Sequence, residues 1–191
     1  MNRLLAVRVP RSLIVVSLLL LVPSLHATVL VPAEFREIVA GSQIIVHGRI
    51  ADVRAVLVDG RRRIDSIVTL EVESYLKGGP AERVTFRVPG GTVGRVRSRM
   101  VGAPEFRPGE EVVLFLRADG PSVPHVFGLN QGVFRVRTEA DTGRRLVVPP
   151  ALTARSESPE VVVRGAADRR PMPLDAFGTQ VRAALAAGGA R

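Results

Sequence analysis

The chain has 191 residues and no cysteine, which excludes disulfide bonds and a lipid-modified cysteine anchor. Its formal net charge is +9, a balance that raises nucleic acid as a partner. Tryptophan is absent and Tyr75 is the only tyrosine, so the aromatic platforms on which single strands stack are scarce. We therefore expect no nucleic-acid partner.

The first residues carry the pattern of a secretory signal peptide. Arg3, Arg8 and Arg11 precede the uncharged apolar run Ser12–Val22, and small residues follow it. A basic start, then a short apolar run and then small residues, in that order, are typical of a cleaved export signal. A bilayer span takes about 20 apolar residues, and this run stops at Pro23. Cleavage is therefore favoured over a retained membrane anchor.

Cleavage is predicted between Ala27 and Thr28, which makes residues 1–27 the signal peptide. This choice puts Leu25 at the minus-three position, where a smaller residue is usual, so cleavage after Ser24 remains a second choice. Either cleavage predicts an exported protein, periplasmic or extracellular, with no stable membrane span afterwards.

A short helix and then long strands are predicted after the signal. Residues 32–40 begin with proline and acids and place apolar side chains on one face, which favours a helix. From Ile44 to Val58 the apolar period changes to two, and the turn pair at residues 59–60 predicts a hairpin to a second strand that ends at Lys77. A third strand follows over residues 84–88. Glycine at position 48 predicts a bend in the first strand.

The middle of the chain alternates between exposed and buried patterns. Residues 92–106 predict an exposed, irregular or edge strand, in which arginines discourage pairing with other chains. The unbroken apolar run Val112–Leu116 predicts a strand buried on both faces. Hairpin-like pieces at 126–129 and 133–136 and a strand at 145–148 follow. A polar, proline-rich linker over 150–173 leads to a helix over 174–191.

These elements predict a mainly β fold. Short strands at close spacing in residues 28–149 favour a small antiparallel barrel or a sandwich. We favour an OB-like β-barrel with a short N-terminal helix and a C-terminal helix, because a strand that bends at a glycine can curve around a closed sheet.

Four stretches carry a resemblance to known proteins. They are AGSQIIVHGRIADV, SIVTLEVESYLKG, FRPGEEVVLFLR and GLNQGVFRV, and they cover about Gly41 to Val136. The stretches resemble a widespread group of exported bacterial proteins of unassigned function. The first half is also similar, more distantly, to netrin-type modules and tissue inhibitors of metalloproteases, which are OB-fold barrels in which a strand also ends in a pair like Lys77-Gly78.

That second resemblance implies the barrel and not the inhibitory mechanism. The inhibitors coordinate the zinc of their target through a cysteine at the mature N-terminus. This chain has no cysteine, and its expected first residue is Thr28.

The sequence offers few candidates for chemistry. His26, His47 and His125 lie on separate elements, whereas zinc sites need three or four convergent ligands. We therefore predict no metal site and no cofactor, with His47 an outward strand residue. Glu71 and Glu73 share a strand face that we expect to be solvated.

The two glutamates are expected to pair with an arginine stripe on another strand. The stripe consists of Arg95, Arg97 and Arg99.

No convergent catalytic set is visible, so we expect a non-enzymatic module that binds a macromolecule of the cell envelope or exterior. The partner would be an exported protein or an acidic envelope polymer. Its contact residues would be Arg95, Arg97, Arg99 and Arg107.

Two other functions remain open at this point. One is a hydrolase of an envelope polymer that uses Glu71, Glu73 and Glu105. The other is a structural or adhesive protein held to acidic polymers by its positive charge.

Overall fold

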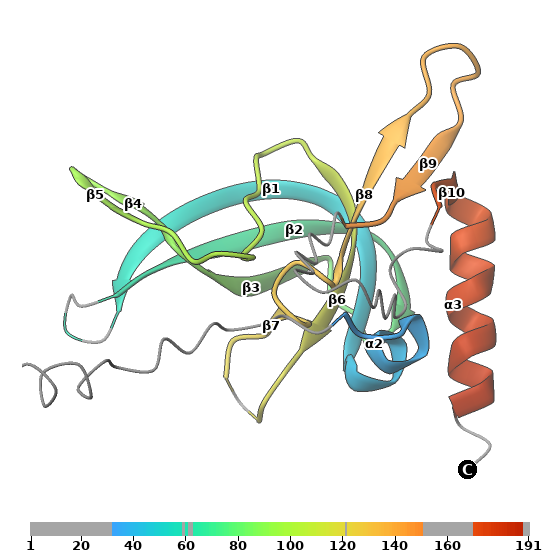
Figure 1. The fold of residues 1–191 in the computed structure, drawn as a ribbon, viewed down its shortest axis with the longest axis horizontal. Coiled ribbons are helices and arrows are strands. Elements are labelled where there is room, and N and C mark those ends of the chain that lie inside the picture. The colour runs from blue at the N-terminus through green and yellow to red at the C-terminus, as the bar shows by residue number, and fades with distance from the viewer. Residues whose placement is uncertain (1–31, 59, 61–62, 121, 151–169, 189–191) are drawn as a thin grey trace, which may run out of the picture. The chain divides into compact units, whose positions relative to one another are not determined.

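The structure is a computed structural model that describes residues 32–58, 60, 63–120, 122–150 and 170–188 (Figure 1). The expected signal peptide, its cleavage site at Ala27 and Thr28, and most of the expected linker lie outside the described residues. No helix within the described ranges combines the length and the apolar character needed to cross a membrane.

Five strands close a β-barrel, in the order β1-β2-β3-β7-β6 and back to β1. Their bounds are Ile44–Val58 for β1, Arg63–Lys77 for β2, Arg83–Pro89 for β3, Glu111–Arg117 for β6 and His125–Val126 for β7. Neighbouring strands run antiparallel except β3 and β7, which pair in parallel at Arg87 and His125. The expected OB-like barrel is confirmed, and the alternative of a sandwich is wrong.

Strand β1 curves along the barrel because its pairing with β2 is interrupted. The register between them shifts at three places, one of them between His47 and Gly48. A Cβ atom at Gly48 would lie 2.0 Å from the backbone oxygen of Glu71, so only glycine allows the two backbones this approach. The bend expected at Gly48 therefore coincides with a register shift and a close crossing of β1 and β2.

Strand β6 is buried on both faces, as its apolar run predicts. Val112, Leu114 and Leu116 point into the barrel, where they pack with the apolar side chains of β1, β2 and β3. Val113 and Phe115 point outward and are equally buried in a second apolar cluster. The outer face of the barrel at β6 is therefore covered by another layer.

This second layer consists of three strands and two helices. They are β8 (Val133–Thr138), β9 (Arg145–Val148), β10 (Met172–Pro173), α2 (Phe35–Gly41) and α3 (Leu174–Gly188). Strand β8 extends the sheet from β6, and β9 and β10 follow it.

Aromatic rings join the two helices to the sheet. Phe35 of α2 and Phe177 of α3 lie 5.7 Å apart between ring centroids, and both rings pack against Phe115 and Phe134 of the sheet. Both expected helices are confirmed, and α3 docks through its buried residues Phe177 and Val181.

Two details differ from the sequence prediction. The pieces at 126–129 and 133–136 do not pair with each other as a hairpin. Each pairs with β6 instead, Val126 with Leu116 and Val133 with Leu114. Residues 172–173, expected in the linker, form β10 against β9.

The exposed segment after β3 is a small hairpin of its own. Strands β4 (Gly91–Val93) and β5 (Val96–Ser98) form a two-stranded sheet, and Gly94 at its turn has a φ of +58°. Ser66 of β2 donates a hydrogen bond of 2.8 Å to the backbone oxygen of Gly90, which fixes the base of the hairpin. Figure 1 shows β4 and β5 at the opposite end of the view from α3.

Candidate functional site

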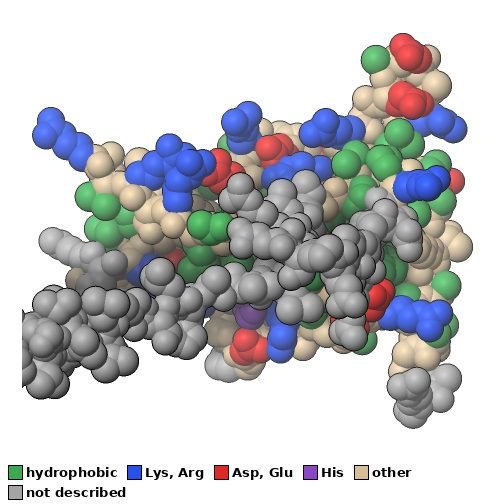
Figure 2. Space-filling model, in the orientation of Figure 1, with side chains coloured by type: hydrophobic (Ala, Val, Ile, Leu, Met, Phe, Trp, Pro, Cys, Tyr) green, Lys and Arg blue, Asp and Glu red, His purple; other side chains and the backbone are tan. Residues whose placement is uncertain are grey.

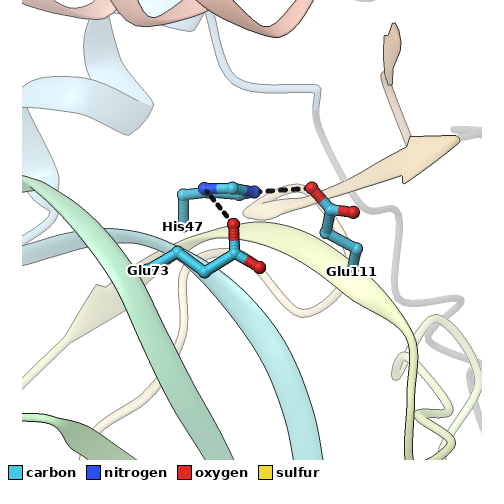
Figure 3. Close-up of side chains that lie close together, drawn as sticks. All are labelled: His47, Glu73 and Glu111. Carbon is cyan, nitrogen blue, oxygen red and sulfur yellow. Dashed lines mark hydrogen bonds and ion pairs between the residues drawn. The ribbon is translucent and has the colours of Figure 1, made fainter. Parts of the chain in front are cut away.

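Three neighbouring strands bring one histidine and two glutamates together on the outer face of the barrel. His47 lies on β1, which pairs with β2 on one side and with β6 on the other. Glu73 comes from β2 and Glu111 from the first position of β6. The three side chains point toward one another (Figure 3), and we call them the His47 group.

The imidazole ring of the His47 group lies between the two carboxylates. Its Nε2 atom is 2.9 Å from Oε1 of Glu111, and its Nδ1 atom is 3.6 Å from Oε2 of Glu73. Each of the three residues offers one potential metal-ligand atom, and these three atoms lie within 4.8 Å of one another. A neutral imidazole carries one N–H, so one ring nitrogen donates and the other keeps a lone pair that can accept a proton or bind a metal ion.

Two arginines complete the charge balance of the group, and they contact different oxygen atoms. Arg145 Nη1 lies 3.2 Å from Glu111 Oε1 and 3.5 Å from Glu73 Oε2, which are the two oxygens that face the imidazole. Arg49 Nη2 lies 3.3 Å from Glu111 Oε2 and 3.9 Å from Glu73 Oε1, the other oxygen of each carboxylate. Two guanidinium groups thus balance two carboxylates.

The group is partly enclosed by the second layer. The side chains of His47 and Glu111 are 7% and 10% exposed, whereas Glu73 is 41% exposed. A pocket of about 350 Å³ lies between the group and α3, where Leu174, Asp175 and Arg182 line it. His47 points outward from the barrel, as expected of an outward strand residue, but it is buried there beneath the second layer.

A second candidate region is the β4–β5 hairpin with the loop that follows it. We call residues 91–107 the hairpin surface. It carries all four arginines expected to contact a partner, which are Arg95, Arg97, Arg99 and Arg107. Each of the four is exposed, and in Figure 2 basic side chains lie at the β4–β5 end and along the upper edge of the visible face.

One glutamate lies among these arginines. Glu105 Oε1 is 3.0 Å from Arg99 and 3.6 Å from Arg97. The hydrogen bond from Arg99, then its positive charge, lowers the pKa of Glu105 below the usual 4.5. Within the described residues, the guanidinium groups of Arg95 and Arg107 have no hydrogen bond or ion pair. The hairpin surface is therefore strongly positive.

Apolar side chains lie beside this charge. Val101 is 96% exposed, Val96 is 61% exposed and Met100 is 48% exposed. A hollow of about 590 Å³ lies between the hairpin and the barrel, and Arg97, Arg99 and Glu105 are among the residues that line it. Adjacent apolar and positive groups at one hollow are typical of a surface that binds another molecule.

The structure corrects what the sequence predicted for the remaining carboxylates. Glu71 pairs with Arg83 of β3 at 3.2 Å, and Glu73 pairs with Arg49 and Arg145. The prediction that Glu71 and Glu73 pair with the arginines of the hairpin is therefore wrong.

The three glutamates of the hydrolase hypothesis are not gathered at one place. Glu71 and Glu105 each pair with arginines outside the His47 group, and the carboxylate that joins Glu73 is Glu111, which sequence reasoning missed. An apolar residue, Ile45, shares the outer face of β1 with His47 and is fully buried. That residue was the available signal that this face is covered.

Comparison of the chain with models of known protein families, with curated proteins and with solved structures finds no match in any of the three. The resemblance to netrin-type modules and to exported bacterial proteins stays a prediction.

Proposed function

We propose that this protein is an exported, non-enzymatic OB-like module that binds an acidic macromolecule through its hairpin surface. The observation that carries the proposal is the combination on residues 91–107 of four exposed arginines with exposed Val96, Met100 and Val101. Export rests on the N-terminal signal pattern alone. The partner is an exported protein with an acidic surface, and an acidic envelope polymer is the second candidate.

The position of the hairpin supports this choice of surface. OB-like barrels commonly bind through the face of their second and third strands and the loops around it. The hairpin follows directly on β3, and its base is held by Ser66 of β2. The binding residues thus lie on a hairpin that is anchored to the barrel at its base.

The exposed apolar side chains of the hairpin surface distinguish a protein partner from an acidic polymer. Binding that rests on charge alone weakens steeply as salt screens it. Burial of Val101 and Met100 in a protein interface adds a contribution that salt does not screen, about 25 cal/mol for each Å² of apolar surface. A protein partner is therefore favoured over a polymer.

The test is capture of partners from the exported fraction of the source organism, with washes at moderate and then high salt. The protein is compared with a variant in which Arg95, Arg97 and Arg99 are glutamine. Its matched control is glutamine at the exposed arginines Arg36, Arg137 and Arg170, which removes equal charge elsewhere. Circular dichroism checks that both variants are folded.

We expect one acidic protein that survives the high-salt wash, is lost with the hairpin variant and is retained by the control. Polyanions that wash away from the wild type and from both variants alike would favour the adhesive protein instead. Retention of the partner by the hairpin variant would overturn the assignment of the surface.

A further inference from the structure

We propose that the His47 group is a binding site for a divalent transition-metal ion, with zinc as the best fit, and that Arg145 takes the place of the ion when none is bound. His47 supplies one imidazole nitrogen, and Glu73 and Glu111 supply one carboxylate oxygen each. This site is separate from the hairpin surface, so the metal-site proposal does not depend on the proposed function.

The donor set and its spacing suit such an ion. One imidazole nitrogen with two carboxylate oxygens matches the ligands of zinc and its neighbours better than those of calcium or magnesium, which prefer oxygen alone. Ligand atoms about 2.1 Å from zinc in tetrahedral geometry are roughly 3.4 Å apart. The three donors lie within 4.8 Å of one another, so they must approach one another only slightly to reach that distance.

Arg145 shows that this point already favours positive charge. Its Nη1 atom contacts Oε2 of Glu73 and Oε1 of Glu111, the same two oxygens that approach His47. A cation is thus held where a metal ion would bind. Because the Arg145 side chain is 50% exposed, solvent screens part of its attraction to the two carboxylates. A divalent ion can therefore displace it into solvent.

Arg49 would remain in place and orient the ligands. It contacts Glu73 Oε1 and Glu111 Oε2, the oxygens turned away from the imidazole. Groups that bind the outer atoms of metal ligands fix their orientation and raise metal affinity. The two arginines thus have different roles, since Arg145 competes with the ion and Arg49 supports its ligands.

The pocket beside the group gives the ion an entry path and room for a further ligand. It has a volume of about 350 Å³ and is lined by His47, Glu73 and Arg145 together with residues of α3. Three protein ligands leave a fourth tetrahedral position for water or for another molecule.

The experiment is titration calorimetry of the purified protein, without a histidine tag, with Zn²⁺ and with Mg²⁺ and Ca²⁺ for comparison. The variants are His47→Gln and Glu73→Gln. Their matched controls are His125→Gln and Glu71→Gln, which change a half-buried histidine outside the group and a glutamate of the same strand β2. Glu73 is partly exposed, so Glu73→Gln keeps the test valid if His47→Gln fails to fold.

We expect one Zn²⁺ per chain, bound far more tightly than Mg²⁺ or Ca²⁺. Affinity falls at least tenfold in His47→Gln and Glu73→Gln and is unchanged in the two controls. Arg145→Gln removes the competing charge and tightens Zn²⁺ binding several-fold, whereas Arg49→Gln weakens it.

Several results would overturn the proposal. They are the absence of stoichiometric Zn²⁺ binding, binding that survives in Glu73→Gln as in Glu71→Gln, or weaker binding after Arg145→Gln.

Discussion

His47 Nε2 lies 2.9 Å from Oε1 of Glu111, although the two residues are 64 positions apart in the chain. The contact exists because β1 and β6 are neighbours in the barrel and because the second layer covers both side chains. Glu111 also contacts both Arg49 and Arg145, as Glu73 does, so the two carboxylates together connect the charges of this region.

A charge-removing change at this contact is expected to destabilise the fold. Glu111→Gln keeps the shape of the side chain but removes the charge of one of the two carboxylates that His47, Arg49 and Arg145 contact. We expect a loss of about 1–3 kcal/mol in the free energy of unfolding, measured by urea denaturation. Glu71→Gln removes an exposed pair with Arg83 and is expected to cost less than about 1 kcal/mol. Equal losses in the two variants would contradict this prediction.

The C-terminal helix is expected to be part of the folded unit. Phe177 is 3% exposed, and its ring lies 5.0 Å from that of Phe134 between centroids. Phe177→Ala leaves a cavity between α3 and the sheet, at a cost of about 3–5 kcal/mol in the free energy of unfolding. Gln180→Ala, on the exposed side of α3, serves as control and should stay within about 0.5 kcal/mol of wild type. If Phe177→Ala unfolded at the same urea concentration as the control, α3 would not contribute to the core.

The crossing of β1 over β2 is expected to tolerate no side chain at Gly48. In Gly48→Ala the new Cβ atom would meet the backbone oxygen of Glu71, so the strands must separate. We expect a loss of about 1–3 kcal/mol or more, seen as a lower melting temperature. Gly188→Ala, where a Cβ atom meets nothing within 4 Å, is the matched control. A Gly48→Ala protein as stable as this control would show that the crossing can relax freely.

The titration of Glu105 gives a pH dependence with a defined sign. Its pKa is lowered below 4.5, first by the hydrogen bond from Arg99 and then by the charges of Arg99, Arg97 and Arg107. The ion pair with Arg99 is therefore fully present above about pH 4.5 and is lost as the pH falls through the lower pKa of the folded state.

We expect carbon-detected NMR to show this low pKa directly. Arg99→Gln should move it back toward the usual value, and Arg97→Gln should move it less, because the contribution of Arg97 is smaller. A Glu105 resonance that titrates identically in all three proteins would contradict the ion pair.

The sequence by itself determined the elements of this protein and the type of its fold. Apolar side chains alternate with polar ones in residues 44–58 and 64–77. This alternation specifies two long strands, because apolar residues at every second position line the one face of a strand that packs on the core. The apolar run Val112–Leu116 required cover on both faces, and the structure provides it with the barrel interior on one side and the second layer on the other. Glycine at position 48 predicted the bend, and the structure adds that a Cβ atom there would meet the backbone oxygen of Glu71.

Only the tertiary structure decided which side chains meet. His47, Glu73 and Glu111 come from three strands, and their meeting depends on the pairing of β1 with β6 and on the register shift between His47 and Gly48. A shift of one residue in a strand moves a side chain to the opposite face of the sheet, so the alternation in the sequence cannot place them. The cover over His47 depends in turn on α3, whose docking is set by aromatic packing between segments far apart in the chain. Local sequence patterns predict the helices and strands, whereas these contacts arise from long-range packing that no local pattern encodes.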